Sequence, residues 1–333
     1  EITTGDWSSD VCSSDLRFPF FVSTIVPACN EAGNIEQFCR LFADMLQSAP
    51  FDGELVYIDD GSTDDTLDKI KAAAAAYPFV RYVSHQHRRG VTDALRSGFS
   101  AARGDVFVFY PADLQFLPED IPALVAPIAD GADLVAGWKQ GEYQKRFVST
   151  VYNWLSRKIF NLKVHDLNAC KAFRRGVVEQ IFMRKDWHRY LVVLAANEGF
   201  RVEEVKVRLY PRAWGRSKYQ SIWRVPVGVL DMLAVKFQLT FLRKPLMFFG
   251  FTGLGFFLLG FLVGLWAVYL KYWRGETQLP LLYLVLLLVG LGIALFAMGF
   301  ITEGQAAIKE ELASMRREVE SRLRQLSRDR DHG

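Results

Sequence analysis

The sequence predicts an α/β domain with a mainly parallel sheet, followed by two membrane-spanning helices. Between Phe18 and Asp113, short β-rich runs alternate with stretches of helical spacing, which is the pattern of such a sheet. Acidic and amide residues follow several of the β-rich runs. Later in the chain, residues 245–270 and 277–302 form two runs of 26 residues without a charge, whereas a membrane-spanning helix needs about 20.

The elements of the sheet domain are expected in regular alternation. Strands are predicted where β-branched and aromatic residues gather, and helices where apolar residues recur every three or four positions. Asn30 is a candidate N-cap of the first helix. The expected strands are FFVSTIVP (20–27), ELVYIDDGS (54–62), FVRYVSH (79–85) and DVFVFYPAD (105–113). The expected helices are NEAGNIEQFCRLFADMLQSA (30–49), DDTLDKIKAAAAAY (64–77) and VTDALRSGFSAA (91–102).

Three polar clusters follow the first, second and fourth of these strands. Each alone is compatible with an ordinary turn, because Asp, Asn and Gly are common turn residues. Together they place carboxylates at the edge of the sheet where ligands bind, without matching Lys or Arg at the strand ends. That arrangement costs free energy unless the carboxylates bind a cation or hydrogen-bond donors, so we expect a ligand site there. The clusters are Asn30 with Glu31, Asp59 with Asp60, and Asp113 with Gln115.

The third cluster lies in the loop FYPADLQF (109–116) and has the composition of a metal site. Phe109 and Tyr110 end a buried strand, and Pro111 stops its pairing. Asp113 and Gln115 then offer oxygen ligands, which suit a hard divalent cation bound together with a phosphorylated ligand. A hard divalent cation is therefore the expected cofactor.

The two uncharged runs predict a membrane hairpin. Two buried core helices are a weaker alternative, because globular helices average about 11 to 12 residues and seldom stay uncharged on every face. Residues 201–244 carry ten Lys or Arg against three acids, the tail 303–333 carries seven Lys or Arg, and the connector KYWRGE (271–276) carries two. By the positive-inside tendency, the large N-terminal part and the tail are expected in the cytoplasm.

Composition excludes several other classes. The formal net charge of +3 gives no reason to expect a nucleic-acid partner. The four cysteines form no CxxC pair and have no His at zinc-ligand spacing, which fits a reduced compartment and argues against disulfides or zinc. Residues 1–17 lack the features of a signal peptide, and SSDVCSSDL resembles translated sequencing-adapter sequence. We expect this segment to be non-native or disordered, and to lie outside the fold.

An ordered set of motifs resembles family 2 glycosyltransferases with the GT-A fold. The match covers roughly residues 20–245 and is most similar to the polyprenyl-phosphate glycosyltransferases of the dolichyl-phosphate mannose synthase type. The two following helices resemble the membrane hairpin of one branch of that group. The motifs are VPACNE (26–31), IDDGSTDDT (58–66), the run from Gly90 through Ala94 to Gly98, ARGD (102–105) and ADLQFLPEDIP (112–122).

The resemblance implies roles for the strand-end residues. Asp113 is expected to be catalytic and to hold Mg²⁺ or Mn²⁺ on the donor diphosphate together with Gln115. The family usually presents Asp-x-Asp here, and Pro111 stands in place of the first acid. A metal that bridges two phosphates needs only one or two protein ligands, so the remaining pair suffices. The residues expected to bind the nucleotide sugar at this edge are Pro27, Asn30, Glu31, Asp59, Asp60 and Ala112.

Downstream segments resemble the family's sugar- and phosphate-binding elements. VHDLNACKAFRR (164–175) resembles Asp-x-x-Ser-Gly-Phe-Arg with Ser and Gly replaced around residues 169–171, and it implies sugar contacts by Asp166 and Asn168, although a buried turn Asp is an equal alternative. RAWGRSKY (212–219) resembles Arg…Gly-x-Ser-Lys. It implies that Arg212, Ser217 and Lys218 reach phosphate oxygens, with Arg212 and Lys218 as catalytic residues. DWHRY (186–190) is a candidate to place His188 and Arg189 at the same mouth, where a structural His is the alternative.

These features predict an inverting transferase that moves one sugar from a GDP- or UDP-linked donor to undecaprenyl or dolichyl phosphate. The acceptor phosphate is already anionic at pH 7, so no His-Asp base is required. The expected location is the cytoplasmic face of a bacterial inner membrane. A polysaccharide synthase of the same fold would need more membrane helices and a Gln-x-x-Arg-Trp element. A catalytically inactive membrane scaffold is the second alternative, which Pro111 invites.

The remaining segments are expected to bind lipid or to self-associate. SIWRVPVGVLDMLAVKFQLTFLRK (221–244) is predicted to form a pair of amphipathic interfacial helices that bring lipid to the site. The tail spaces apolar residues by three and four, which predicts a helix that either associates with a second copy or packs against the catalytic domain. Association through the membrane helices is a further alternative. The expected order is 1–17 non-native, 18–220 catalytic, 221–244 interfacial, 245–302 membrane hairpin and 303–333 tail.

Overall fold

A computed structural model describes most of the chain as two compact units, Glu1–Val225 and Pro226–Gly333, and each is considered by itself. Residues 1–16, the greater part of the segment expected to be non-native, lie outside the described ranges. The structure describes residues 17–141, 146–181, 183–184, 186–212, 224–241, 245–275 and 279–331.

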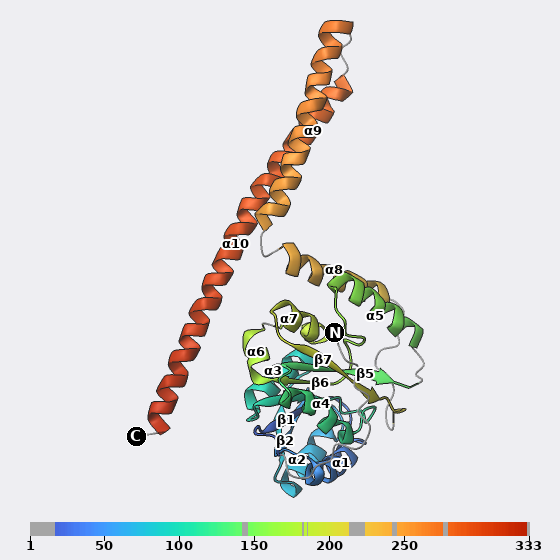
Figure 1. Cartoon of the computed structure of the whole chain (residues 1–333), viewed down its shortest axis with the longest axis vertical. Coiled ribbons are helices and arrows are strands. Elements are labelled where there is room, and N and C mark those ends of the chain that lie inside the picture. The colour runs from blue at the N-terminus through green and yellow to red at the C-terminus, as the bar shows by residue number, and fades with distance from the viewer. Residues whose placement is uncertain are drawn as a thin grey trace. The chain divides into compact units, whose positions relative to one another are not determined.

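The first unit is built on a seven-stranded, mainly parallel sheet, as the alternation of strand and helix patterns predicts (Figure 1). The strand order is β3-β2-β1-β4-β6-β5-β7, and β6 alone among them runs antiparallel to its neighbours β4 and β5. The α/β expectation is therefore confirmed. The strands are β1 (Val22–Ala28), β2 (Gly53–Asp59), β3 (Val80–Ser84), β4 (Val106–Phe109), β5 (Leu134–Gln140), β6 (Lys171–Arg174) and β7 (Val202–Arg208).

Helices cover both faces of this sheet. One face packs against α1, α2 and α4 through a core that includes Phe38, Ile70 and Leu124. The other face packs against α3, where Phe99 stacks on Phe107 with ring centroids 5.5 Å apart. The helices of the unit are α1 (Ile35–Ser48), α2 (Thr66–Ala76), α3 (Val91–Ala101), η1 (Pro118–Asp120), α4 (Ile121–Ala129), α5 (Arg146–Phe160), α6 (Arg175–Gln180), η2 (Trp187–Tyr190) and α7 (Leu191–Asn197).

The expected N-cap at Asn30 is wrong. Helix α1 begins at Ile35, with Asn34 at the N-cap position. Asn30 instead adopts a left-handed conformation with φ of 55°. Its side-chain Oδ1 accepts a hydrogen bond from the backbone N–H of Thr63 at 2.9 Å, so a contact with the loop after β2 overrides the local helix signal.

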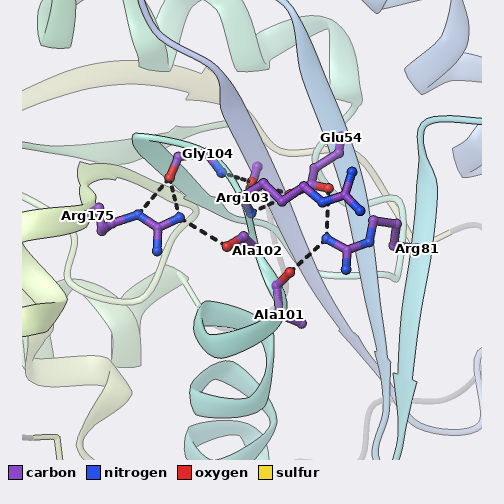
Figure 2. Close-up of polar contacts among 8 residues, drawn as sticks. Glu54, Arg81, Ala101, Ala102, Arg103, Gly104 and Arg175 are labelled. Carbon is purple, nitrogen blue, oxygen red and sulfur yellow. Dashed lines mark hydrogen bonds and ion pairs between the residues drawn. The ribbon is translucent and has the colours of Figure 1, made fainter. Parts of the chain in front are cut away.

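At the amino edge of the sheet, a polar network joins the ends of β1, β2, β4 and α3. The buried Glu54 carboxylate accepts hydrogen bonds from Ser23 Oγ and from the backbone N–H of Arg103, both at 2.7 Å. Arg81 binds Glu54 and the carbonyl of Ala101, while Arg175 binds the carbonyls on the other side of this turn (Figure 2). The network explains the ARGD motif as a structural element.

The glycine of that motif has a steric reason. A Cβ at Gly104 would lie 2.6 Å from the carbonyl oxygen of Phe21 and 2.7 Å from the backbone nitrogen of Ser23. Real Cβ atoms do not approach backbone this closely, so β1 and the turn before β4 require glycine here. The close approach also lets the Gly104 N–H donate to Ser23 Oγ at 2.8 Å.

The second unit contains one helix where the sequence predicted an amphipathic pair. Helix α8 runs without interruption from Arg224 to Phe241. Pro226 lies in its first turn, where the missing N–H has no helical partner to lose, so this proline does not divide the helix. Leu230 and Leu233 are at least half exposed, which leaves apolar surface of the kind that an interfacial helix presents.

Two helices long and apolar enough to cross a membrane follow, as predicted: α9 (Pro245–Arg274) and α10 (Leu279–Asp331). The tail is not a separate helix, because α10 continues from the apolar segment through the charged one (Figure 1). The two helices approach closely where Gly253 faces Gly292. A Cβ at Gly253 would lie 2.6 Å from the carbonyl oxygen of Gly292, so small residues permit this packing. The Glu303 carboxylate accepts the backbone N–H of Leu246 at 3.0 Å, at the start of α9.

Candidate active site at the carboxyl edge of the sheet

The sheet topology brings the three predicted clusters together. Strands β2, β1 and β4 are adjacent and parallel, so the loops that follow them leave the same edge side by side. These loops carry Asp59 and Asp60, Asn30 and Glu31, and Asp113 and Gln115 in that order. This strand order places all three clusters at one edge of the sheet, as predicted.

The first cluster cross-links two loops. The backbone N–H of Asn30 donates to Ser62 Oγ at 3.0 Å, and its side-chain Nδ2 donates to Thr63 Oγ1 at 3.2 Å. The Glu31 carboxylate accepts a hydrogen bond from Asn34 Nδ2 at 2.8 Å. Pro27 lies half-buried within β1, one residue before the strand ends. This cluster therefore fixes the loop after β1 against the loop after β2.

The second cluster divides into two different environments. Asp59 accepts hydrogen bonds from the Ser62 N–H at 3.2 Å and from Ser84 Oγ at 3.1 Å. Asp60 binds His85 Nδ1 at 2.9 Å and accepts the backbone N–H groups of Arg89 and Gly90, both at 2.8 Å.

Asp60 is a positioning residue in this geometry. Burial raises the pKa of its carboxyl, but hydrogen bonds from His85 and from the backbone of Arg89 and Gly90 outweigh burial and hold the pKa below its usual value. The ionised carboxylate thereby fixes the loop before α3. His85 continues the chain of contacts through Nε2 to Ser97 Oγ at 2.9 Å.

The third cluster is organised around Arg212. One guanidinium nitrogen, Nη2, lies 2.6 Å from Asp113 Oδ2 and 3.4 Å from Gln115 Oε1. The segment that carries Arg212 is held in place because the Tyr210 N–H donates to the Gln115 carbonyl at 2.8 Å. Burial raises the pKa of Asp113, and the charge of Arg212 opposes but does not cancel that effect. The expectation that the acids lack a basic partner is therefore wrong at Asp113.

This geometry fits a divalent cation. Asp113 Oδ2 and Gln115 Oε1 both face the Arg212 nitrogen, so two hard oxygen donors converge on one point that already attracts a positive charge. Within the described residues, no group of three or more His, Cys, Asp or Glu side chains could hold a metal ion. Two protein oxygens leave the other ligand positions of a bound cation to phosphate and water.

Two lysines that sequence reasoning missed accompany the predicted sugar-contacting residues. Lys139 of β5 pairs with Asp166 Oδ2 at 3.2 Å, and Asp166 Oδ1 accepts the backbone N–H of Asn168 at 2.8 Å. Lys171 opens β6 directly opposite Phe109, which ends β4. Its ammonium lies 5.6 Å from the centroid of the Phe109 ring. Lys171 therefore lies on the strand next to β4, the strand that leads into the Asp113 loop.

His188 and Arg189 lie on η2 and are half-buried, and His188 contacts α3. His188 Nδ1 is 3.1 Å from Thr92 Oγ1. Burial, followed by the charges of Arg189 and Lys171, lowers the pKa of His188 to about 3, so its ring is neutral at physiological pH. A neutral ring can donate or accept a hydrogen bond but supplies no charge to a phosphate.

The remaining predicted residues are Ala112, Ser217 and Lys218. Ala112 is almost fully buried within the 109–116 loop. Ser217 and Lys218 lie outside the described residues. His85 escaped prediction although it sits at a strand end, because a single His there carries no distinctive pattern.

Comparison with known proteins defines the class. The model of glycosyl transferase family 2 matches residues 23–182. Dodecaprenyl-phosphate galacturonate synthase of Rhizobium johnstonii is 31% identical over 294 residues, which cover 85% of each chain. Undecaprenyl-phosphate 4-deoxy-4-formamido-L-arabinose transferase of Shewanella sediminis is 28% identical, with 81% of this chain and 83% of that protein covered.

The fold comparison agrees. Glucosyl-3-phosphoglycerate synthase of Mycobacterium tuberculosis, solved with Mg²⁺ and UDP, superposes with a TM-score of 0.53 at 22% identity, over 64% of this chain and 79% of that one. The chain belongs to glycosyl transferase family 2, and is a glycosyltransferase with a GT-A-like sheet and two apolar C-terminal helices.

Proposed function

We propose that the protein transfers one sugar from a nucleotide sugar to a polyprenyl phosphate at a membrane. The observation that carries the proposal is the convergence of Asp113 and Gln115 on one guanidinium nitrogen of Arg212, beside the other two strand-end clusters, in a chain that continues into two apolar helices. The relatives named above act, by their names, on dodecaprenyl and undecaprenyl phosphate. They differ in the sugar, which is galacturonate in one and a formamido-arabinose in the other.

Asp113 and Gln115 would hold a Mg²⁺ or Mn²⁺ ion. When bound, such an ion neutralises the charge that develops on the departing nucleoside diphosphate. Pro111 supplies no second carboxylate, and two protein oxygens suffice when phosphate completes the ligand set. Arg212 and the cation compete for the same two oxygens, which would free the guanidinium to bind phosphate as the donor enters.

The rest of the edge positions substrate. A polyprenyl phosphate oxygen is anionic at pH 7, so the protein need not remove a proton from it. The Asp60–His85 pair holds the loop before α3, and the Asn30 contacts hold the loop after β1. Both loops are therefore fixed before substrate binds. Such preorganisation spares the cost of ordering loops during the reaction. Asp59, Glu31 and Pro27 are proposed to contact the nucleotide, and Ser217 and Lys218 the phosphates.

The charge distribution supports an orientation. The segment before α9 and the tail after the apolar part of α10 are rich in Lys and Arg, whereas the connector carries two such residues. We propose that the catalytic unit and the tail face the cytoplasm at a bacterial inner membrane. Helix α8, with exposed leucines, would lie at the lipid surface that holds the acceptor. Association of two copies through the tail or the membrane helices stays a prediction.

Glycolipid synthesis tests the proposal directly. Purified full-length protein is incubated with undecaprenyl phosphate and a panel of labelled UDP- and GDP-sugars, with and without a chelator. We expect one donor to yield a lipid-linked monosaccharide that fails to form when metal is removed. Label in long polymer would instead support a polysaccharide synthase. No transfer from any donor, with no metal-dependent binding of UDP or GDP, would support the inactive scaffold.

A further inference from the structure

The buried charges beside the proposed sugar position are unbalanced. Lys171 is 2% exposed, and Lys139 is mostly buried on the neighbouring strand. The Asp166 carboxylate pairs with Lys139, and Glu204, which accepts a hydrogen bond from the Asp166 N–H at 3.1 Å, pairs with His165. His188 nearby is neutral. Within the described residues, Lys171 therefore has no carboxylate of its own as an ion-pair partner.

Lys171 is poorly satisfied within the described structure. Within the described residues its ammonium donates one hydrogen bond, to the Ala169 carbonyl at 2.8 Å, whereas an ammonium group has three donors. The Phe109 ring supplies a further, weaker attraction. Burial lowers the pKa of Lys171 to about 8, and the charge of Asp166 only partly offsets this. An arrangement that costs free energy in the empty protein is common where a ligand completes it.

The position of Lys171 points to the donor sugar. Its strand partner Phe109 lies four residues before Asp113, so the ammonium is adjacent to the loop proposed to hold the donor diphosphate. Lys171 also comes shortly after residues 166–168 in the sequence, the turn that is proposed to contact sugar hydroxyls. A lysine has a flexible four-carbon stem, so Lys171 can extend its ammonium toward a ligand at this edge. A sugar ring attached to the diphosphate would lie between these two elements.

We propose that Lys171, with Lys139 beside it, binds a carboxylate on the transferred sugar, so that the donor is a nucleotide-linked uronic acid. The inference rests on the proposed function and assigns its substrate class. A single carboxylate would balance the second ammonium of the cluster. A neutral sugar would leave Lys171 buried with unfilled donors, and a site built for a charged group rejects an analogue that lacks it.

The acceptor phosphate is a second source of negative charge, and Lys171 is the less suitable group for it. A phosphate with two or more charged oxygens is best matched by the forked guanidinium of an arginine. Arg212, which contacts Asp113, is such a residue. Acceptor binding is therefore included as an outcome that would contradict the inference.

Matched donor pairs test the assignment. The full-length protein in detergent is given undecaprenyl phosphate with UDP-glucuronate or UDP-glucose, UDP-galacturonate or UDP-galactose, and GDP-mannuronate or GDP-mannose. We expect the acid of one pair to be transferred with kcat/KM about 10- to 100-fold above its neutral partner, the range of a charged hydrogen bond. Transfer of a neutral sugar as well as or better than its acid would overturn the inference while leaving the proposed function intact. No transfer from any donor would contradict both.

Variants locate the selectivity. Lys171→Met should lower kcat/KM for the acid donor about 10- to 100-fold and leave the neutral donor unchanged. Lys139→Gln should lower it as well, because Asp166 would lose its partner and repel the donor carboxylate. Lys69→Met, on the exposed face of α2, serves as the matched control and should change neither. An equal rise in KM for undecaprenyl phosphate with both donors would place the lysines at the acceptor and refute the assignment. The comparison of donor pairs in the unaltered protein holds even if a variant fails to fold.

Discussion

Glu54 at the amino edge of the sheet and Asp113 at the carboxyl edge are both buried acids, yet they are bound in different ways. Glu54 is held by Ser23, by the Arg103 backbone and by Arg81, all from elements whose positions the sheet fixes. Asp113 is held by Arg212, from a segment that leaves the sheet after β7. A fixed partner stabilises the fold, whereas a partner that can be displaced leaves a carboxylate available to a ligand.

The same contrast applies to basic residues. Arg175 at the amino edge donates to the Gly104 carbonyl through two nitrogens, at 2.9 and 2.7 Å, and to the Ala102 carbonyl. Lys171 at the carboxyl edge donates to one carbonyl and carries no ion pair within the described residues. Buried polar groups satisfied by the protein belong to its architecture, and unsatisfied ones mark where chemistry is expected. The comparison predicts that substitutions at one edge change stability and at the other change activity.

The largest effect is expected from Asp113→Asn. The variant keeps the shape of the side chain but removes the charge that holds a divalent cation, so turnover should fall about 100-fold or more. Pro111→Asp adds a ligand that the geometry does not require and should be tolerated much better. Steady-state turnover at saturating metal measures both. Near-normal turnover of Asp113→Asn, or activity that appears only in Pro111→Asp, would refute the metal assignment.

A matched substitution at the other edge should have the opposite profile. Glu54→Gln removes a buried charge from the network with Ser23 and Arg81, which should cost about 1–3 kcal/mol of stability and lower the Tm by several degrees. The activity of the folded fraction should be unchanged. Thermal unfolding and donor kinetics on the same preparation separate the two effects. A variant with normal Tm and reduced kcat would show that the amino edge takes part in catalysis.

Lys171→Met should increase stability while it removes selectivity for the donor. The buried ammonium is disfavoured in the folded state, and an apolar side chain of similar length avoids that cost, with a gain of about 1–3 kcal/mol. The folded pKa of about 8 lies below the ordinary value of 10.5, so the gain should be largest at neutral pH and should shrink as pH rises between these values. The Tm measured at pH 7 and pH 9.5 tests this. A lower Tm at both pH values would indicate that Lys171 has a structural role.

The smallest effect is expected at Asp120, which follows the Asp113 loop. Its Oδ2 atom is buried without a hydrogen-bond partner in the described structure, and burial, followed by the charge of Glu119, raises the pKa to about 6. The pKa of Asp120 in the folded protein exceeds its ordinary value of 3.8. Ionisation of Asp120 therefore destabilises the protein increasingly as pH rises from 3.8 to about 6. Asp120→Asn should therefore raise Tm by a few degrees at pH 8 and by less at pH 5. An equal change at both pH values would show that ionisation of Asp120 does not matter.

The sequence was sufficient for the features that depend on local pattern. Strand and helix alternation predicted the parallel sheet, and uncharged runs predicted α9 and α10. The metal site at Asp113 and Gln115 was predicted because their residue types define hard ligands, and it stays a prediction. Features that depend on tertiary partners were missed or misassigned. Asn30 binds Thr63 in another loop and caps no helix, and Arg212 reaches Asp113 across 99 positions of sequence.

The lysines were missed for a related reason. Lys171 falls where the sequence departs from the family's sugar-binding segment, and that departure was the available signal. Nothing in a single sequence shows that Lys139 lies on the neighbouring strand and shares Asp166, since the pairing of β5 with β6 brings them together. A local departure from a motif is therefore worth examining for what it adds as well as for what it removes.

The most direct test of the account is metal-dependent binding of a nucleoside diphosphate. Titration calorimetry of UDP and GDP into the full-length protein with Mn²⁺ should show binding of one of them, which is lost with EDTA. Binding should weaken strongly in Asp113→Asn and stay unchanged in Glu54→Gln. Binding that is independent of metal, or equal weakening in both variants, would contradict the assignment of the carboxyl edge as the catalytic one.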